Sequence, residues 1–419
     1  MNYGIFTWGS RGDVQPFISL ELMEYKHRVT LFAPENFKKF IEEYGIAFSP
    51  LHGNVDEILH SAEGLSVLKS RNPISLLRHM QKQGKKVQPL LNRDLLVGCE
   101  KVEVIITSVL CHVWISCIAE KLQKKWALIT FSPPTTPTKE FPFAGLAFFN
   151  NPMFNRFSHK LVRYLYWTFN KKDINNFRKS ISLPILKSNI LHRLTDESIL
   201  HIYAISPSLI PRPKDWNSNS TITGYLFLPR KLREHNQMDQ ISDDIVAFLK
   251  KGAQPIYIGM GSMPVPNIDV LKKVITDILE TTNYRIILCK GNTEILSLPI
   301  HHNLLIINYV NHDWLLPQCK LAIIHGGAGT IATTLKAKIP MIITSVFGDQ
   351  PWWGKIIESK TLGLHIPFKK LNSKKILELI NRVQSDKIKI NITDIGEKIM
   401  NENGTKKALH LINQYLKIY

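Results

Sequence analysis

The sequence predicts an α/β protein with two domains of near-equal size, each built on a parallel β-sheet covered by helices. The chain has 419 residues, of which 44% are hydrophobic and 21% charged, which suits two globular domains and argues against a disordered or coiled-coil chain. Short apolar runs alternate with segments of helical periodicity. One polar connector interrupts this alternation, which then resumes.

The first half opens with a strand, a glycine loop and a helix. Residues 2–7 form a short apolar run, the loop WGSRGD follows at 8–13, and residues 14–24 show a period near 3.6. Further predicted elements are strands at 27–34, 46–50, 102–108 and 126–131 and helices at 35–44 and 112–122. A long loop rich in Pro, Phe and Thr at 133–149, with a basic aromatic helix after it at 156–169, is expected to form a binding element.

The pattern restarts after residues 224–240, which contain Pro229 and a run of charges and predict an interdomain linker. The elements predicted beyond it are helices at 243–250, 268–281 and 330–337 and strands at 256–260, 285–289, 304–307, 320–324 and 341–344. The expected division is residues 1–225, a linker at 226–240 and residues 241–419, with a terminal helix that can pack back on the first domain. Two such halves predict Rossmann-like domains facing a central cleft.

Charge and cysteine content restrict the partners. The chain has 53 Lys and Arg against 34 Asp and Glu, a formal net charge of +19. This surplus favours phosphate-rich or anionic-membrane partners, although it can also be spread over a solvated surface. Nucleic acid is not expected, because no localised basic stripe or known binding module occurs. Five cysteines without a C-x-x-C pair are expected to be buried thiols rather than disulfides or a zinc site.

Location follows from two further observations. No apolar run approaches the ~20 residues that cross a bilayer, and the first residues show no secretory signal. We therefore expect a cytoplasmic protein, with peripheral contact at the inner membrane surface as an option. The scattered histidines, among them His52, lack a metal-ligand spacing and are interpreted as ordinary surface or core residues.

The glycine loop HGGAGT at 325–330 lies between a predicted strand and a predicted helix. A strand that turns through glycines into a helix presents free backbone N–H groups and the positive helix end, which together favour a phosphate. The imidazole of His325 adds a donor, although a capping or buried histidine is the alternative. The loop is neither a Walker A motif nor a G-x-G-x-x-G fingerprint.

A second polar group follows the next strand, in the segment GDQPWWGK at 348–355. Asp349 accepts hydrogen bonds and Gln350 both donates and accepts them, which suits the hydroxyls of a sugar. HGGAGT, GDQPWWGK and the opening GSRGDVQPF together resemble the family 1 glycosyltransferases of GT-B fold, especially the branch of macrolide, glycopeptide, flavonoid and sterol glycosyltransferases. The resemblance also covers TPTKEFPF at 136–143 and NHDWLLP at 311–317, and so runs through most of the chain.

The resemblance implies that the C-terminal domain binds the nucleotide-sugar. The residues it assigns to the diphosphate are His325, Gly327, Gly329 and Thr330, with a second contact from Gly261 and Ser262. It assigns the sugar hydroxyls to Asp349 and Gln350, stacking on the base to Tyr309, and base-edge hydrogen bonds to the backbone of Val310. Many relatives hold the ribose with Glu at the position where this chain has Thr333. A core role is the alternative for Tyr309.

The resemblance places acceptor activation in the N-terminal domain. It points to Asp13 as the base that removes the acceptor proton, whereas an N-cap of the following helix is the structural alternative. Ser10, Arg11 and Gly12 are implied as part of the same acceptor loop, and Arg11 can instead form an ordinary salt bridge. Further along the chain, Phe141 and Phe143 belong to an aromatic cluster that can line an acceptor pocket, dock to a membrane beside basic residues, or simply pack the domain.

The function this implies is an inverting, metal-independent glycosyltransferase. It would move a hexose from a nucleotide diphosphate sugar, UDP-glucose above all, to a hydroxyl of a lipophilic acceptor such as a sterol, polyketide, polyphenol or lipid. No cofactor is expected, because the nucleotide-sugar is a co-substrate. Two alternatives stay open: a non-catalytic protein that binds nucleotide or lipid at an anionic membrane, and a sugar-nucleotide epimerase of the same fold.

Overall fold

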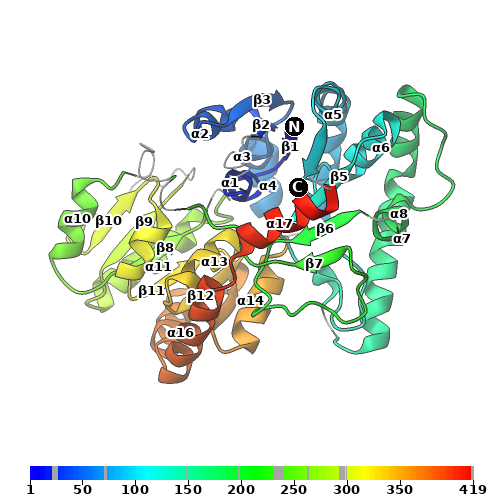
Figure 1. Cartoon of the computed structure of the whole chain (residues 1–419). Helices are drawn as coiled ribbons and strands as arrows, with labels where there is room; N and C mark the ends of the chain where they lie inside the picture. The colour runs from blue at the N-terminus through cyan, green and yellow to red at the C-terminus, as the bar shows by residue number, and fades with distance from the viewer. Residues whose placement is uncertain are drawn as a thin grey trace. The chain divides into compact units, whose positions relative to one another are not determined.

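The computed structural model describes residues 1–20, 27–69, 73–147, 149–196, 199–229, 232, 240–261, 264–291, 298 and 300–416. The chain divides into two compact units (Figure 1). Unit 1 comprises Met1–Val55, Gln83–Pro229 and Glu402–Tyr419, and unit 2 comprises Asp56–Lys82 and Arg230–Asn401. The passage from Pro229 to Arg230 falls inside the range predicted to be the linker, most of which lies outside the described residues.

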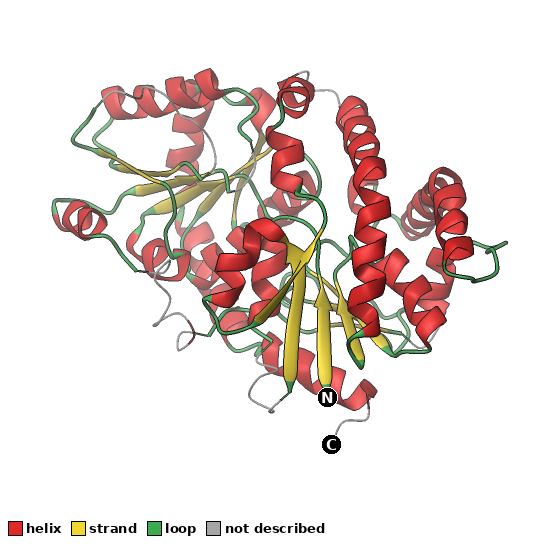
Figure 2. Ribbon diagram, turned by 90° about the horizontal axis from the view of Figure 1, so that it is seen from above, coloured by secondary structure: helices red, strands yellow, loops and turns green. Residues whose placement is uncertain are grey.

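Unit 1 contains a seven-stranded parallel sheet with the order β3-β2-β1-β4-β5-β6-β7. The strands are β1 (Asn2–Phe6), β2 (Arg28–Pro34), β3 (Ala47–Leu51), β4 (Val104–Thr107), β5 (Trp126–Thr130), β6 (Leu200–Tyr203) and β7 (Ser220–Ile222). Every residue of β4, β5 and β6 is buried, as expected for a parallel sheet with helices on both faces (Figure 2).

The first half of the chain also forms helices of very different length. They are α1 (Arg11–Ile18), α2 (Lys38–Glu42), α3 (Val55–His60), α4 (Ala62–Lys69), α5 (Pro73–Glu100), α6 (His112–Leu122), α7 (Pro152–Ser180) and α8 (Ile190–Asp196), with short 3-10 turns at Glu35–Phe37 and Ala144–Leu146. Helix α7 is longer than predicted, because Asn151 accepts a hydrogen bond from the Phe154 N–H and Pro152 occupies the first turn.

Unit 2 contains a six-stranded parallel sheet with the order β10-β9-β8-β11-β12-β13. The strands are β8 (Ile256–Gly259), β9 (Ile286–Cys289), β10 (Leu304–Ile307), β11 (Leu321–Ile324), β12 (Met341–Ser345) and β13 (Gly363–Pro367). The helices are α10 (Asp243–Lys250), α11 (Ile268–Thr281), α12 (His312–Leu315), α13 (Ala328–Lys336), α14 (Gln350–Ser359), α15 (Ser373–Val383) and α16 (Asp386–Met400), with 3-10 turns at Leu316–Gln318 and Phe368–Lys370. Two parallel-sheet, Rossmann-like α/β units are therefore present, as predicted.

The last helix, α17 (Gly404–Leu416), belongs to unit 1 and packs beside β6 (Figure 1). Its start is held by a close backbone contact, since a β-carbon on Gly404 would stand 2.5 Å from the carbonyl oxygens of Gly224 and Tyr225. The preceding Glu402 accepts a hydrogen bond from the Ser206 hydroxyl at 2.5 Å. Residues 402–419 thus belong to unit 1, the packing that the sequence analysis allowed for the terminal helix, whereas 56–82 belong to unit 2 although they lie in the first predicted range. Packing contacts rather than chain order assign a helix to a unit.

Each sheet has one pair of neighbouring strands at which the strand order reverses, because the chain continues from one of them toward one edge of the sheet and from the other toward the opposite edge. These strands are β1 and β4 in unit 1 and β8 and β11 in unit 2. Loops at the carboxyl ends of such strands form the usual ligand site of an open α/β sheet. The loop at 8–13 follows β1, and the loop that His325 begins follows β11. The fold therefore positions both predicted loops at the switch points of their sheets.

Candidate functional site

The imidazole of His325 lies between two glycines of unit 2. A β-carbon built on Gly261 would stand 2.6 Å from His325 Cε1, and one built on Gly327 would stand 2.5 Å from His325 Nε2. A β-carbon essentially never lies within 3.0 Å of a non-bonded heavy atom, so both positions require glycine as long as the ring stays in place. Gly261 follows β8 and Gly327 precedes α13. The structure thus brings together three of the predicted diphosphate residues.

The turn that places the ring also opens the end of a helix. Gly326 has a φ of 96°, in the region that favours glycine, and Gly327 is the N-cap of α13. The N-cap has no side-chain hydrogen bond, and within the described residues the N–H groups of Ala328, Gly329 and Thr330 have no acceptor. Free N–H groups at a helix N-terminus form a site suited to an anion.

Burial sets the charge of His325. Only 7% of its surface is exposed, and burial lowers the pKa of the imidazole to about 4. The Gly259 carbonyl opposes this shift, yet Nδ1 forms no hydrogen bond of normal geometry with a described residue. The ring is therefore neutral at pH 7, with one nitrogen that donates a hydrogen bond and one that accepts. It can stabilise a phosphate oxygen as a hydrogen-bond donor.

Asp349 and Gln350 lie at the start of α14, after β12. The Asp349 carboxylate accepts a hydrogen bond from the Trp353 indole N–H at 2.9 Å, and the pKa of Asp349 is raised because burial outweighs that bond. The side-chain oxygen of Gln350 accepts from the N–H groups of Val346 at 2.7 Å and Phe347 at 3.3 Å. These bonds occupy the oxygen of the Gln350 amide, so the amide offers its N–H donors to a sugar, and its predicted role as an acceptor is reduced.

The residues assigned to the nucleoside lie in a different loop of the same unit. Tyr309 is partly exposed and Val310 is buried, in the segment that connects β10 with α12. The start of α12 is anchored by a 2.6 Å hydrogen bond between the Tyr257 hydroxyl and His312 Nε2. Ser262 lies outside the described residues. The Thr333 hydroxyl donates to the Gly329 carbonyl at 2.9 Å and is thus bonded to its own helix.

In unit 1, the Asp13 carboxylate closes a capping box at the start of α1. Its Oδ2 accepts from the Ser10 backbone N–H at 2.8 Å and from the Ser10 hydroxyl at 3.1 Å. Ser10 is the N-cap, so α1 begins at Arg11 rather than at the predicted residue 14. Gly9, with a φ of 147°, leaves space for the carboxylate, because a β-carbon there would stand 2.3 Å from Oδ2. Asp13 therefore does help to cap a helix, as the structural alternative proposed. It does so as the third residue of α1 and not as its N-cap.

The other predicted acceptor residues have identifiable contacts. The Arg11 guanidinium lies 4.2 Å from the centre of the Phe40 ring, and its Nε donates to Gln15 at 3.0 Å. Gly12 is exposed at the start of α1. Both predicted phenylalanines are held against α7: Phe143 donates its backbone N–H to Ser158 at 2.8 Å, and the Phe141 carbonyl lies 3.2 Å from His159 Nε2.

One polar pair beside this loop was not predicted. His52, which follows β3, lies with Nδ1 2.6 Å from Asp94 Oδ2, and its ring is about half exposed. The His52 carbonyl accepts from the indole N–H of Trp8 at 3.0 Å, directly before the 9–13 segment. A histidine held by a carboxylate at one nitrogen and exposed at the other has the arrangement of a general base. The separation of 42 positions along the chain hides the pair of His52 and Asp94 from sequence patterns.

The described residues contain neither a helix suited to span a membrane nor a cluster suited to hold a metal ion. None of the helices in these parts of the chain combines the length and apolar character needed to cross a bilayer. In the same residues, no group of three or more His, Cys, Asp or Glu side chains is arranged to hold a metal ion. The four cysteines at 99, 111, 117 and 319 are buried free thiols, as expected, and Cys289 is partly exposed.

Comparison with protein families matches both halves of the chain. Residues 3–142 match the glycosyltransferase family 28 N-terminal domain. Residues 272–407 match the C-terminal domain of proteins like erythromycin biosynthesis protein CIII. The two matches contain the 8–13 loop and the His325 loop, respectively.

Among curated proteins, the chain is similar along nearly its whole length to sterol 3-beta-glucosyltransferases. It is 31% identical to UGT80A2 of Arabidopsis thaliana over 97% of the chain, and 30% identical to UGT80B1 of the same plant over 99%. It covers 64% and 68% of those two proteins. The sterol 3-beta-glucosyltransferase of Saccharomyces cerevisiae is 30% identical over 99% of the chain, which covers 35% of that protein.

Solved structures confirm the fold. The glycotransferase of kitacinnamycin superimposes with a TM-score of 0.71 at 16% identity, covering 99% of this chain and 98% of that one. SsfS6 of Streptomyces sp. SF2575, complexed with thymidine diphosphate, gives 0.62 at 15% identity with 99% of both chains covered. Together with the matches in both halves, these similarities show that the chain belongs to the family 1 glycosyltransferases of GT-B fold, which include the sterol 3-beta-glucosyltransferases.

Proposed function

We propose that the chain transfers a hexose from a UDP-sugar, UDP-glucose above all, to a hydroxyl of a sterol-like lipophilic acceptor, with inversion at the anomeric carbon. The observation that carries the proposal is the neutral His325 ring packed between Gly261 and Gly327 beside the free N-terminus of α13. The similarity to sterol 3-beta-glucosyltransferases over 97–99% of the chain supports the acceptor class and the donor.

In the proposed reaction, a base removes the proton of the acceptor hydroxyl while its oxygen attacks the anomeric carbon of the sugar. The bond between that carbon and the diphosphate oxygen breaks, and the nucleoside diphosphate leaves with the electron pair. Negative charge on the leaving diphosphate is stabilised by the N–H groups at the start of α13 and by the donor nitrogen of His325. Asp349 and Gln350 hold the sugar hydroxyls as acceptor and donor.

Asp13 is our first choice for the base, and His52 is the second. Asp13 Oδ2 already accepts two hydrogen bonds from Ser10, which stabilise the ionised carboxylate. His52 is supported by the 2.6 Å contact of its Nδ1 with Asp94, which fixes the ring and leaves Nε2 to act. Asn has the shape of Asp, and at position 52 its amide N–H can still donate to Asp94 while the Nε2 position is lost, so Asp13→Asn and His52→Asn separate the two assignments.

The function is tested by measuring UDP release from UDP-glucose with and without a pool of sterols and other hydroxylated lipophiles. The expected result is slow release alone, faster release with an acceptor, and a product heavier by one hexose. A parallel assay with TDP-glucose tests whether the enzyme prefers uracil or thymine as the nucleobase of its donor. If folded protein bound UDP but transferred no sugar to any acceptor, the catalytic proposal would be wrong and a nucleotide-binding role would replace it.

A further inference from the structure

Exposed apolar side chains concentrate on one short stretch of unit 1. Among the described residues, fifteen large hydrophobic side chains are exposed, and six of them lie between 149 and 169. All four exposed aromatic residues of that group belong to this stretch, with exposed fractions between 55% and 67%. The six are Phe149, Met153, Phe157, Tyr164, Leu165 and Phe169. Scattered exposed apolar residues are normal on a soluble surface, whereas a concentration of this kind marks an interaction site.

Three of these side chains share one face of α7. Met153, Phe157 and Tyr164 are spaced by four and seven residues, so they project within about 40° of one another around the helix axis. In the first turns of α7 the opposite face is used by the fold, since it carries the buried residues Asn155, Ser158 and His159. Figure 1 shows α7 at the periphery of unit 1 beside α8. In this first part of α7 the exposed face therefore lies away from the side chains that hold the helix in its unit.

The charges on α7 are almost all positive. Its sequence contains seven Lys and Arg residues and one acidic residue, Asp173. Arg156 and Lys160 are exposed, and each follows an exposed apolar residue by three positions, Met153 and Phe157 respectively, so both flank the exposed face at about 60°. Lys is depleted in protein–protein interfaces, whereas Lys and Arg beside an apolar face that contains Phe are typical of helices that lie in a membrane interface. Their stems extend along apolar surface while the charged ends reach lipid phosphates.

We propose that the exposed face of α7 docks to an anionic lipid bilayer. Met153, Phe157 and Tyr164, with Phe149 next to the helix, enter the boundary between headgroups and acyl chains. Arg156 and Lys160 contact lipid phosphates, and the net charge of +19 adds long-range attraction. The proposal does not depend on sugar transfer. If the acceptor is a membrane lipid, this docking brings unit 1 to the surface in which that acceptor is dissolved.

Cosedimentation of the full chain with vesicles tests the proposal. One set of vesicles is phosphatidylcholine, and in the other about a third of the lipid is phosphatidylglycerol. We expect at least tenfold stronger binding to the anionic set, and a strong loss of binding when salt shortens the screening length from about 10 Å to about 3 Å. Equal binding to both sets, or binding that ignores salt, would overturn the electrostatic part of the proposal.

Surface variants identify the docking face. Phe157→Ser with Tyr164→Ser, and Arg156→Glu with Lys160→Glu, are each expected to weaken binding about tenfold or more. Ile390→Ser and Lys387→Glu on the exposed surface of α16 are the matched controls and should bind like the parent protein. If controls and α7 variants bound alike, another surface would be responsible. If Phe157→Ser instead dissociated a dimer, a second copy of the chain would cover this face and the membrane proposal would fail.

A fluorescence measurement covers the case in which a variant folds poorly. Tyr164→Trp adds a reporter at an exposed position of α7 to the eight native tryptophans, and brominated acyl chains in anionic vesicles are expected to quench the emission that it adds to that of the parent protein. Val97→Trp, at an exposed position of α5, is the control and should not be quenched. Absence of quenching at position 164 in vesicle-bound protein would show that α7 does not enter the bilayer.

Discussion

His325 Nε2 lies so close to Gly327 that a β-carbon on the glycine would stand 2.5 Å from it. Gly327 has a φ of −66°, so alanine there is strained by the ring and not by the backbone. We therefore expect Gly327→Ala to displace the imidazole and to lower kcat by about 100-fold, as removal of one transition-state hydrogen-bond donor does. Steady-state kinetics with UDP-glucose checks this, with His325→Ala for comparison.

The control for this change is two residues away. A β-carbon on Gly329 would meet no atom within 4 Å, and Gly329 lies in the first turn of α13. Gly329→Ala should therefore keep the fold and most of the activity. Equal losses for the two alanine variants would show that the helix end, and not the position of His325, limits the reaction.

Asp13→Asn separates catalysis from helix capping. The amide oxygen of Asn can still accept from Ser10, so we expect a loss of stability of less than about 1 kcal/mol together with a loss of kcat of about 100-fold or more. Ser10→Ala is expected to have the opposite effect, a loss of stability with sugar transfer retained, because it removes one hydrogen bond of the capping box and keeps the Asp13 carboxylate. Thermal unfolding and sugar transfer are measured on both. Normal transfer by Asp13→Asn, with loss of transfer in His52→Asn, would assign the base to His52.

Trp353→Phe should change the pH dependence of donor use. The pKa of Asp349 is raised by burial, and the hydrogen bond from Trp353 partly offsets that rise. Without the bond the pKa rises further, so the acid limb of the kcat/KM profile for UDP-glucose should move to higher pH. Trp352→Phe is the matched control, since Trp352 is equally large and also buried. An acid limb that stays in place in Trp353→Phe would mean that Asp349 does not need to be ionised for catalysis.

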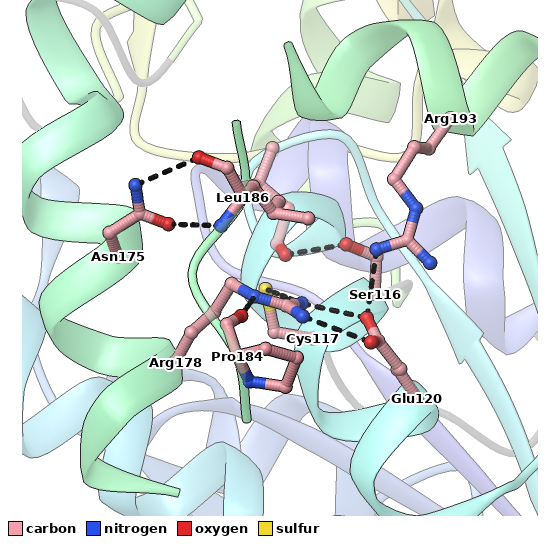
Figure 3. A network of polar contacts seen from close by, with 9 residues as sticks. Ser116, Cys117, Glu120, Asn175, Arg178, Pro184, Leu186 and Arg193 are labelled. Atoms are coloured by element: carbon pink, nitrogen blue, oxygen red, sulfur yellow. Dashed lines mark hydrogen bonds and ion pairs between the residues drawn. The ribbon is translucent and has the colours of Figure 1, made fainter. Parts of the chain in front are cut away.

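Glu120→Gln should destabilise unit 1. The Arg178 guanidinium, in a side chain only 1% exposed, donates to both Glu120 carboxylate oxygens at 2.7 and 2.9 Å and to the Pro184 carbonyl at 2.8 Å (Figure 3). Loss of the carboxylate leaves a buried cation without a counter-charge, and we expect a cost of about 3 kcal/mol in the free energy of unfolding.

Arg193 provides the comparison for this cluster. Its guanidinium bonds to the same Glu120 oxygen at 2.9 Å, but its side chain is 34% exposed. Arg193→Gln should therefore cost less than about 1 kcal/mol. Denaturant unfolding measures both variants, and similar losses would show that burial does not determine the strength of these two ion pairs.

Acid should weaken the fold through buried histidines. Burial lowers the pKa of His201 to about 3. Between about pH 6.5 and 3, His201 therefore binds a proton in the unfolded chain but not in the folded chain. The free energy of unfolding therefore falls as the pH falls through this range. His201→Gln lacks the titration, so the stability difference between parent and variant should be smaller at pH 5 than at pH 7. A constant difference, measured by urea unfolding, would contradict the assigned pKa.

Local patterns along the chain were sufficient for much of the fold. Helices α6, α10 and α11 and strand β10 begin and end at the predicted residues, because periodicity and caps are properties of a few consecutive side chains. The start of α1 was placed too late, although Ser10 and Asp13 have the spacing of a capping box. No element was predicted between residues 55 and 100, where α5 alone has 28 residues.

The candidate site also has one part that local sequence patterns predict and another that only long-range contacts determine. The His325 loop could be predicted because its strand, glycines and helix are contiguous in the chain. The contact of Gly261 with His325 and the pair of His52 with Asp94 join residues tens of positions apart. Such contacts arise when strands take their order in a sheet and bring distant loops to one edge. One-dimensional patterns carry the residue types that bind a phosphate, whereas the neighbours that bury and orient each side chain follow from long-range packing.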